Sequence, residues 1–207
     1  RKTKVKENLL FYSHLRTLKS IDRADVIMYM VDVKESLVRQ DLRIIQDVLE
    51  KGKPVLIAFN KWDLIEKDNK TYNKFNKDAA DKLGQLSYVL TEYISVYDKQ
   101  RLYKIFDILW DLNLERQKVV KTSHLNRTML PLIDQTPPPG VMGKELKIKF
   151  ISQSPSSYPI FLFFMTHAKL LPEHYKRFLE NRLRDIYGFN GVPIKLIFKE
   201  NKDKGID

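Results

Sequence analysis

The sequence contains no cysteine, so disulfide bonds and thiolate-bound metals are excluded. A reducing compartment such as the cytoplasm fits this composition. The longest apolar runs, at residues 26–31 and 160–165, fall far short of the ~18 residues that a helix needs to cross a bilayer, so no membrane span is predicted. The four histidines are scattered and lack the close spacing of a zinc site, so no metal site is predicted either.

Positive charge is in excess. The 207 residues include 37 Lys or Arg against 26 Asp or Glu, a formal net charge of +11. The stretch from Lys118 to the C-terminus has 15 basic and 8 acidic residues and carries most of this excess. This excess of basic residues favours a polyanionic partner for the C-terminal half. The alternative is a basic surface that only faces solvent and has no nucleic-acid role. The basic segment at residues 1–6 is a second candidate for RNA contact.

Strand-like and helix-like segments alternate in the first half of the chain. Strands are predicted at residues 24–33, 54–59 and 91–96, and the first of them is apolar almost throughout, as expected of a strand buried on both faces of a parallel sheet. Helices are predicted at residues 37–51, 72–86 and 102–114, the last of which is expected to bury Phe106 and Trp110. This order predicts an α/β fold with an open parallel sheet and flanking helices.

The pattern changes after about residue 115. A helix at 123–133, strands at 144–150 and 158–166, a helix from 172 to 187 and a strand at 192–198 predict a separate α+β module. On its long helix, four basic residues alternate with the apolar stripe and are expected to face solvent: Lys176, Arg177, Arg182 and Arg184. The letters G-x-x-G at 188–191 match the RNA clamp of KH domains, but they lie between a helix and a strand and are interpreted as a helix stop and a turn.

The tetrapeptide Asn60-Lys61-Trp62-Asp63 follows a buried strand directly. Ligands of open α/β sheets bind beyond the carboxyl ends of the strands. The Asp63 carboxylate can accept hydrogen bonds from both the ring N–H and the amino group of guanine. Adenine would leave this carboxylate unpaired, and a polar pair of this kind discriminates by about 10⁴ or more. We expect Asn60 to donate to the guanine N7 and to tie loops together, and Lys61 to lay its aliphatic stem over the base and sugar.

Ser95 and Val96 form a second candidate element at the end of the next predicted strand. The Ser95 hydroxyl and the Val96 backbone N–H are expected to reach the oxygen of the base. Ordinary polar capping of strand ends is the alternative for both elements. Asp32, which ends the first predicted strand, either reaches a metal or a loop or caps the turn that follows.

These residues resemble a known family. N-K-W-D after one strand and I-S-V at the end of the next resemble the fourth and fifth guanine-recognition motifs of translation-factor-type GTPases. The segments TPPPG (136–140), LPEHYKRFLENRLR (171–184) and GFNGVPI (188–194) closely resemble the KH-like domain of the Der (EngA) family of bacterial ribosome-assembly GTPases. The resemblance implies the second half of a P-loop GTPase domain at residues 1–116 and a KH-like α+β domain at 117–207. It also implies a cytoplasmic GTPase that acts, with rRNA as a partner, in assembly of the large (50S) ribosomal subunit.

The sequence departs from the family in one large respect. The phosphate-binding motif G-x-x-x-x-G-K-[ST] is absent, and no D-x-x-G precedes Asn60. We therefore expect no catalytic residue and no Mg²⁺ ligand in this chain. The chain is interpreted as a fragment or as lacking its leading segments. For the intact protein, the resemblance implies GTP or GDP and Mg²⁺ as cofactors. The alternative is a non-catalytic rRNA- or ribosome-binding module with a vestigial guanine half-site.

Overall fold

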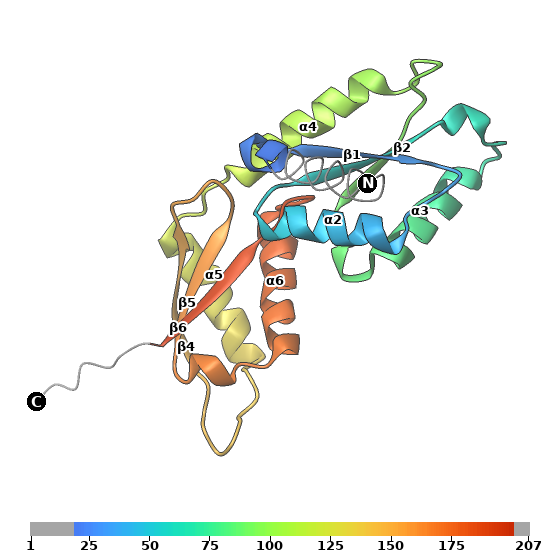
Figure 1. Ribbon diagram of the computed structural model, residues 1–207. Helices are drawn as coiled ribbons and strands as arrows, with labels where there is room; N and C mark the ends of the chain where they lie inside the picture. The colour runs from blue at the N-terminus through green and yellow to red at the C-terminus, as the bar shows by residue number, and fades with distance from the viewer. Residues whose placement is uncertain (1–18, 201–207) are drawn as a thin grey trace, which may run out of the picture. The chain divides into compact units, whose positions relative to one another are not determined.

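The computed structural model describes residues 19–200, and the basic segment at 1–6 lies outside them. The chain forms two compact units, and the boundary between them falls between Asn113 and Leu114. Each unit has a hydrophobic core of its own. The two units are described separately below (Figure 1).

The first unit contains a parallel three-stranded sheet in the order β1 (Ile27–Asp32), β2 (Val55–Asn60) and β3 (Leu90–Tyr93). Helices α2 (Arg39–Glu50) and α3 (Thr71–Leu83) lie on one side of this sheet and α4 (Leu102–Arg116) on the other (Figure 1). The predicted open parallel sheet with flanking helices is therefore confirmed. Its register pairs Asp32 with Asn60, so the carboxyl ends of β1 and β2 lie side by side.

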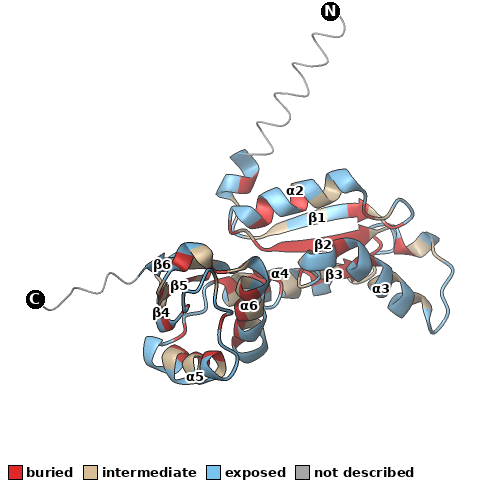
Figure 2. Ribbon diagram, turned by 90° about the horizontal axis from the view of Figure 1, so that it is seen from below, coloured by how far each residue is buried: buried red, intermediate tan, exposed pale blue. Residues whose placement is uncertain are grey.

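Strand β2 is the buried centre of this sheet. All of its residues before Asn60 are buried, and Figure 2 shows the strand red along its length. Its side chains alternate between two layers: Val55, Ile57 and Phe59 belong to the core formed with α2 and α3, whereas Leu56 and Ala58 are buried outside that core cluster. The continuous apolar run of β2 is thus explained by burial on both faces.

Three sequence-based expectations for the first unit were wrong. Strand β1 is not buried on both faces, because it pairs only with β2 among the described strands and leaves Met28 and Met30 exposed. On α4 the buried side chains include Ile105, whereas Phe106 and Trp110 are 68% and 63% exposed. The third strand ends at Tyr93, earlier than predicted, because the chain then turns and pairs residue 95 with residue 100 in an isolated bridge.

The second unit has the predicted order of elements. Helix α5 (Thr122–Gln135) is followed by β4 (Ile148–Ser154), β5 (Ile160–Met165), α6 (Glu173–Tyr187) and β6 (Lys195–Glu200). The sheet has the order β4-β5-β6; β4 runs antiparallel to β5, and β6 runs parallel to it. One face of this sheet packs with α5 and α6 around a core that includes Phe161, Phe163 and Leu179.

The first strand of this unit was predicted four residues too early. Strand β4 spans Ile148–Ser154, whereas the alternating charged and apolar residues at 144–150 indicated a strand there. The residues before it form a turn in which Val141 and Lys144 pair in an isolated bridge. Asn126 of α5 fixes the strand further along, because its side chain accepts from the Ile151 N–H at 2.8 Å and donates to the Ile151 carbonyl at 2.6 Å.

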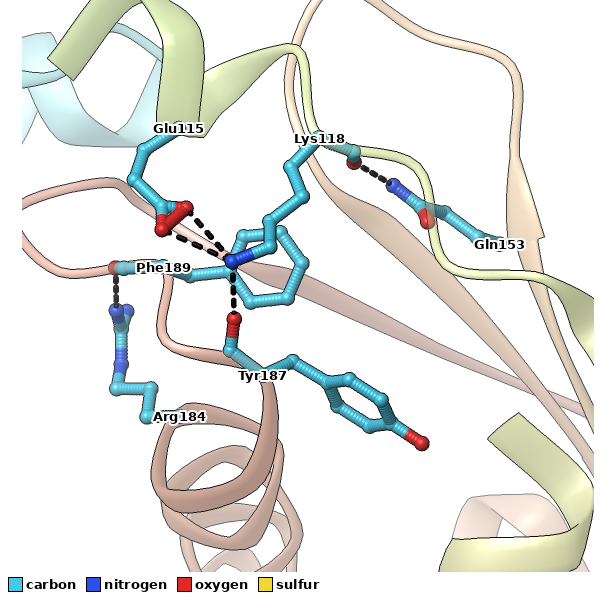
Figure 3. Close-up of polar contacts among 6 residues, drawn as sticks. All are labelled: Glu115, Lys118, Gln153, Arg184, Tyr187 and Phe189. Carbon is cyan, nitrogen blue, oxygen red and sulfur yellow. Dashed lines mark hydrogen bonds and ion pairs between the residues drawn. The ribbon is translucent and has the colours of Figure 1, made fainter. Parts of the chain in front are cut away.

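Helix α6 ends at a junction that Lys118 organises (Figure 3). Gly188 follows the helix with a φ of +86°, the left-handed region that glycine favours. Lys118 Nζ donates to the Tyr187 carbonyl at 2.6 Å and to the Glu115 carboxylate at 3.0 Å, and it lies 5.5 Å from the centre of the Phe189 ring. A cation therefore satisfies a carbonyl of the last helical turn, where the helix dipole favours positive charge.

Arg184 does not belong to the solvent-facing basic group in which it was predicted. Its side chain is only 13% exposed and pairs with Glu180 one turn earlier on α6. It also donates to the carbonyls of Phe189 and Val192, at 2.8 and 2.9 Å. Arg184 thus holds the turn between α6 and β6 in place, and the G-x-x-G letters at 188–191 lie within that turn between the helix and the strand.

Candidate functional site

The loop after β2 begins with a sharp change of direction. Asn60 ends the strand, and Lys61 adopts a left-handed conformation with φ of +67° and ψ of +34°. Trp62 then turns back into the core, where it is 2% exposed and packs 4.6 Å from the ring of Tyr93. Its backbone N–H donates to the Ile94 carbonyl at 3.0 Å. Burial of Trp62 therefore leaves the residues on either side of it, Lys61 and Asp63, at the carboxyl end of the sheet.

The five predicted base-binding residues come together from two loops. Asn60 Oδ1 accepts a hydrogen bond from the Val96 N–H at 3.0 Å. Ser95 Oγ donates to Asp63 Oδ1 at 2.5 Å and accepts from the Asp98 N–H at 3.0 Å. The side chain of Asn60 thus ties the two loops together, as the sequence led us to expect. The Ser95 hydroxyl and the Val96 N–H, which were expected to reach the oxygen of a base, donate to Asp63 and Asn60 instead.

Asp63 retains capacity to accept further hydrogen bonds. Its side chain is half-buried, and among residues 19–200 its Oδ2 has no hydrogen-bond or ion-pair partner. Because a carboxylate oxygen has more than one acceptor site, Oδ1 can also accept while it is bound by Ser95. The carboxylate is turned neither fully into solvent nor toward a neighbouring cation, so its geometry is compatible with two parallel donors on one ligand edge.

Lys61 forms an ion pair across the sheet end. Its Nζ lies 2.6 Å from Asp32 Oδ2, and Asp32 Oδ1 accepts from the backbone N–H of Lys34 at 3.0 Å. Asp32 therefore caps the turn after β1, one of the two roles expected for it, and also fixes the head of Lys61. No sequence pattern indicates this pairing, because the two residues belong to different strand ends.

This ion pair predicts a pH dependence. The hydrogen bond from Lys61, followed by that from the Lys34 backbone, holds the pKa of Asp32 below its ordinary value of 3.8. A lowered carboxyl pKa stabilises the folded state above the unfolded pKa, and this contribution is lost as the pH falls through the folded pKa. We expect Asp32→Asn to flatten the loss of folding free energy below about pH 4. Urea unfolding followed by the fluorescence of the two tryptophans, both in the first unit, measures this loss.

Asp47→Asn is the matched control, because this exposed carboxylate on α2 has no hydrogen-bond or ion-pair partner among the described residues. The Asp32→Asn variant and the wild type must differ in their loss of folding free energy below pH 4. If the loss is the same in both, the role of the ion pair with Lys61 is contradicted.

A buried carboxylate that the sequence analysis missed supports the second loop. Glu92 of β3 is 2% exposed and pairs with Arg101 at 3.2 Å and with Lys104 at 2.6 Å. These contacts connect β3 to the residues that follow the Ser95 turn. The signal in the sequence was an acidic residue within a predicted strand, because a glutamate is rarely buried unless it is paired.

A cavity of about 590 Å³ lies near the same end of the sheet, but it is not at the predicted base site. Its lining includes Phe59, Phe75, Asp78 and Tyr93, and none of the five predicted base-binding residues lines it. Within residues 19–200 the buried hydroxyl of Tyr93 has no hydrogen-bond partner, and burial raises the pKa of this hydroxyl. The candidate site for a base is therefore the surface formed by the two loops.

Residues 19–200 also lack clustered metal-binding groups and a membrane-spanning helix. In that part of the chain, no three His, Asp or Glu side chains gather closely enough to hold a metal ion. No helix there has both the length and the hydrophobicity to cross a bilayer.

The architecture is a parallel three-stranded sheet with flanking helices, followed by an α+β unit with a mixed three-stranded sheet. Residues 120–199 match the family described as the KH-domain-like region of EngA bacterial GTPase enzymes, C-terminal. The second unit therefore belongs to this family of KH-like domains. The resemblance of the chain to the Der (EngA) family is thereby confirmed.

Relatives that carry the name GTPase Der match almost the whole chain. The protein of Chloroherpeton thalassium is 44% identical over 199 residues, which cover 96% of this chain and 46% of the relative. That of Chlorobium phaeobacteroides is 40% identical over 200 residues, which cover 97% and 46%. The chain thus spans about half the length of the curated relatives it matches. A solved structure, Era in complex with MgGDPNP and nucleotides 1506–1542 of 16S ribosomal RNA, matches with a TM-score of 0.39 and 17% identity, covering 89% of this chain and 68% of that one.

Proposed function

We propose that the first unit supplies the guanine-recognising half of the nucleotide site of a GTPase. The observation that carries this proposal is the pair of hydrogen bonds between the two loops, from Val96 to Asn60 and from Ser95 to Asp63. They gather the side chains that guanine requires at the carboxyl end of a parallel sheet, where ligands of such sheets bind. In the intact protein, GTP or GDP would be the ligand.

Each of the five residues has a chemical role in this proposal. Asp63 accepts from the ring N–H and the amino group of guanine, and Asn60 donates to N7 through its amide nitrogen while its oxygen stays bound to Val96. Ser95 holds Asp63, and the backbone N–H of Val96 holds Asn60. The aliphatic stem of Lys61 covers the base while Asp32 fixes its ammonium group. The phosphates and Mg²⁺ would be held by segments of a longer protein, since this chain has no phosphate-binding motif.

The cellular role that we propose is GTP hydrolysis coupled to assembly of the large (50S) ribosomal subunit, with rRNA as a partner. Support comes from the relatives named GTPase Der, from the KH-like second unit and from the positive net charge of +11. Positive charge attracts the phosphate backbone of RNA independently of its sequence.

A second candidate function is a non-catalytic rRNA- or ribosome-binding module. The excess of basic residues after Lys118 and the missing phosphate-binding motif favour it for the chain by itself. In that case the loops after β2 and β3 would be a vestige of a nucleotide site. Binding to rRNA that falls steeply between about 50 and 200 mM salt, with no nucleotide affinity in any longer form of the protein, would support this alternative.

Calorimetric titration with GDP and ADP tests the proposed function. The longer protein should bind GDP and discriminate against ADP by about 10⁴, because adenine leaves the carboxylate of Asp63 unpaired. The 207-residue chain alone should bind GDP weakly or not at all, since the contacts to the phosphates are missing. Equal affinity of the longer protein for GDP and ADP would refute guanine recognition by these loops.

A further inference from the structure

The sheet of the second unit has two faces of different character. Phe161, Phe163 and Met165 of the central strand β5 are fully buried in the core with α5 and α6. The alternate residues of the sheet point to the other side, which we name the open sheet face. Strand register places its members in three rows: Phe150, Phe164 and Lys199; Ser152, Leu162 and Ile197; Ser154, Ile160 and Lys195.

No described helix of the second unit covers the open sheet face. Figures 1 and 2 show α5 and α6 on the same side of the sheet, and the core cluster contains residues from both helices. None of the apolar residues of the open sheet face belongs to that cluster or is packed against it. Phe150 is 43% exposed. The described part of the unit thus leaves an apolar sheet surface available to a partner.

The open sheet face combines aromatic rings with positive charge. The rings of Phe150 and Phe164 lie side by side with centroids 5.8 Å apart. Lys199 is directly opposite Phe164, and Lys195 is opposite Ile160 at the other end of the face. Both lysines are exposed and form no ion pair within residues 19–200. Two adjacent rings have one lysine beside them and a second at the far end of the face, and none of the nine residues is a carboxylate. This arrangement suits a partner that has flat rings and negative charge.

We propose that the open sheet face binds single-stranded RNA, with unpaired bases stacked on Phe150 and Phe164 and backbone phosphates near Lys195 and Lys199. Aromatic side chains on a sheet are an established means of stacking nucleic-acid bases, and lysines beside them neutralise phosphates. The two lysines are four residues apart on one strand, about 13 Å, so they can contact different phosphates of one strand. This inference names the RNA-contacting surface and rests on the RNA role within the proposed function.

Fluorescence anisotropy with a labelled single-stranded RNA of about 12 nucleotides tests the inference on the full chain, at a length within the range that one such surface covers. The variant with Phe150→Ala and Phe164→Ala should lose affinity about tenfold or more. The corresponding variant with leucine at both positions should lose affinity to a similar degree, because it retains apolar area but cannot stack. Tyr103→Ala, which removes an aromatic side chain that is 86% exposed on α4, is the matched control and should bind as the wild type does.

The lysines are tested separately by salt dependence. Lys195→Gln and Lys199→Gln should each reduce the slope of log affinity against log salt by about 0.7, the value for one phosphate contact on a single strand. Lys176→Gln is the control on α6. It should leave the slope of log affinity against log salt unchanged, because Lys176 does not belong to the open sheet face.

Several results would overturn the inference. Unchanged RNA affinity in the alanine variant would do so, as would wild-type affinity in the leucine variant or equal binding of a duplex of the same length. Loss of self-association in the alanine variant, with RNA binding intact, would identify the face as a protein interface instead. The GDP affinity of the longer protein is measured in parallel. If RNA binding depends on the two phenylalanines but GDP is not bound, the proposed nucleotide function fails and the RNA surface stands.

Discussion

Asp63→Asn is expected to abolish the preference of the longer protein for guanine nucleotides. The amide that replaces the carboxylate presents one donor and one acceptor group, so it opposes one of the two donors of guanine. We expect the affinity for GDP to fall by about 10⁴ and the affinity for xanthosine diphosphate to rise, because the new amide can donate to the additional carbonyl of xanthine. The hydrogen bond from Ser95 to residue 63 is preserved, since an amide oxygen can still accept from Ser95 Oγ.

Displacement titrations with GDP, xanthosine diphosphate and ADP measure this change of specificity. Glu66→Gln is the matched control: this acidic residue is three positions further along the chain, is exposed and should not affect nucleotide binding. If GDP affinity is unchanged in the Asp63→Asn protein, the assignment of Asp63 to guanine is wrong.

Phe163→Ala and Phe164→Ala should differ widely in their effect on stability, although the residues are neighbours on β5. Phe163 is fully buried and packs 5.2 Å from the ring of Phe198, so its truncation should cost about 3–5 kcal/mol of unfolding free energy in the second unit. Phe164 lies on the open sheet face, and its truncation should cost about 1 kcal/mol.

Hydrogen exchange at the amides of β4, β5 and β6 in the full chain measures the difference. Tryptophan fluorescence does not report it, because Trp62 and Trp110 both lie in the first unit. Equal destabilisation by the two variants would show that the two faces of the sheet are not distinguished as described. The small expected cost of Phe164→Ala also means that this substitution can be used for RNA-binding measurements on a folded protein.

The sequence predicted the types and order of the elements well, because hydrophobic period depends on local residues. The predictions failed where the exposure of a side chain depends on which other elements pack against its own. Met28 and Met30 are apolar and yet exposed at a sheet edge, and Trp110 is exposed on α4. The start of β4 was misplaced because charged residues alternate with apolar ones before the strand begins, whereas the side chain of Asn126 fixes the strand further on.

The sequence predicted the candidate site only in part. The motif at the end of β2 located Asn60 and Asp63, since a polar loop after a buried strand has a fixed place in a parallel sheet. The pairing of Asp32 with Lys61, and that of Glu92 with Arg101, joins residues from different elements. Such contacts have no periodic signal, so only the three-dimensional structure reveals them.

The mutual bonding of the two loops has a kinetic consequence. Asn60 and Asp63 are braced by Val96 and Ser95 before any base arrives, so docking of a purine demands little further ordering of the chain. A rigid receptor of this kind captures its ligand at a rate governed by encounter rather than by rearrangement. The lifetime of a bound nucleotide would then depend on contacts to its phosphates, for which this sequence has no binding motif.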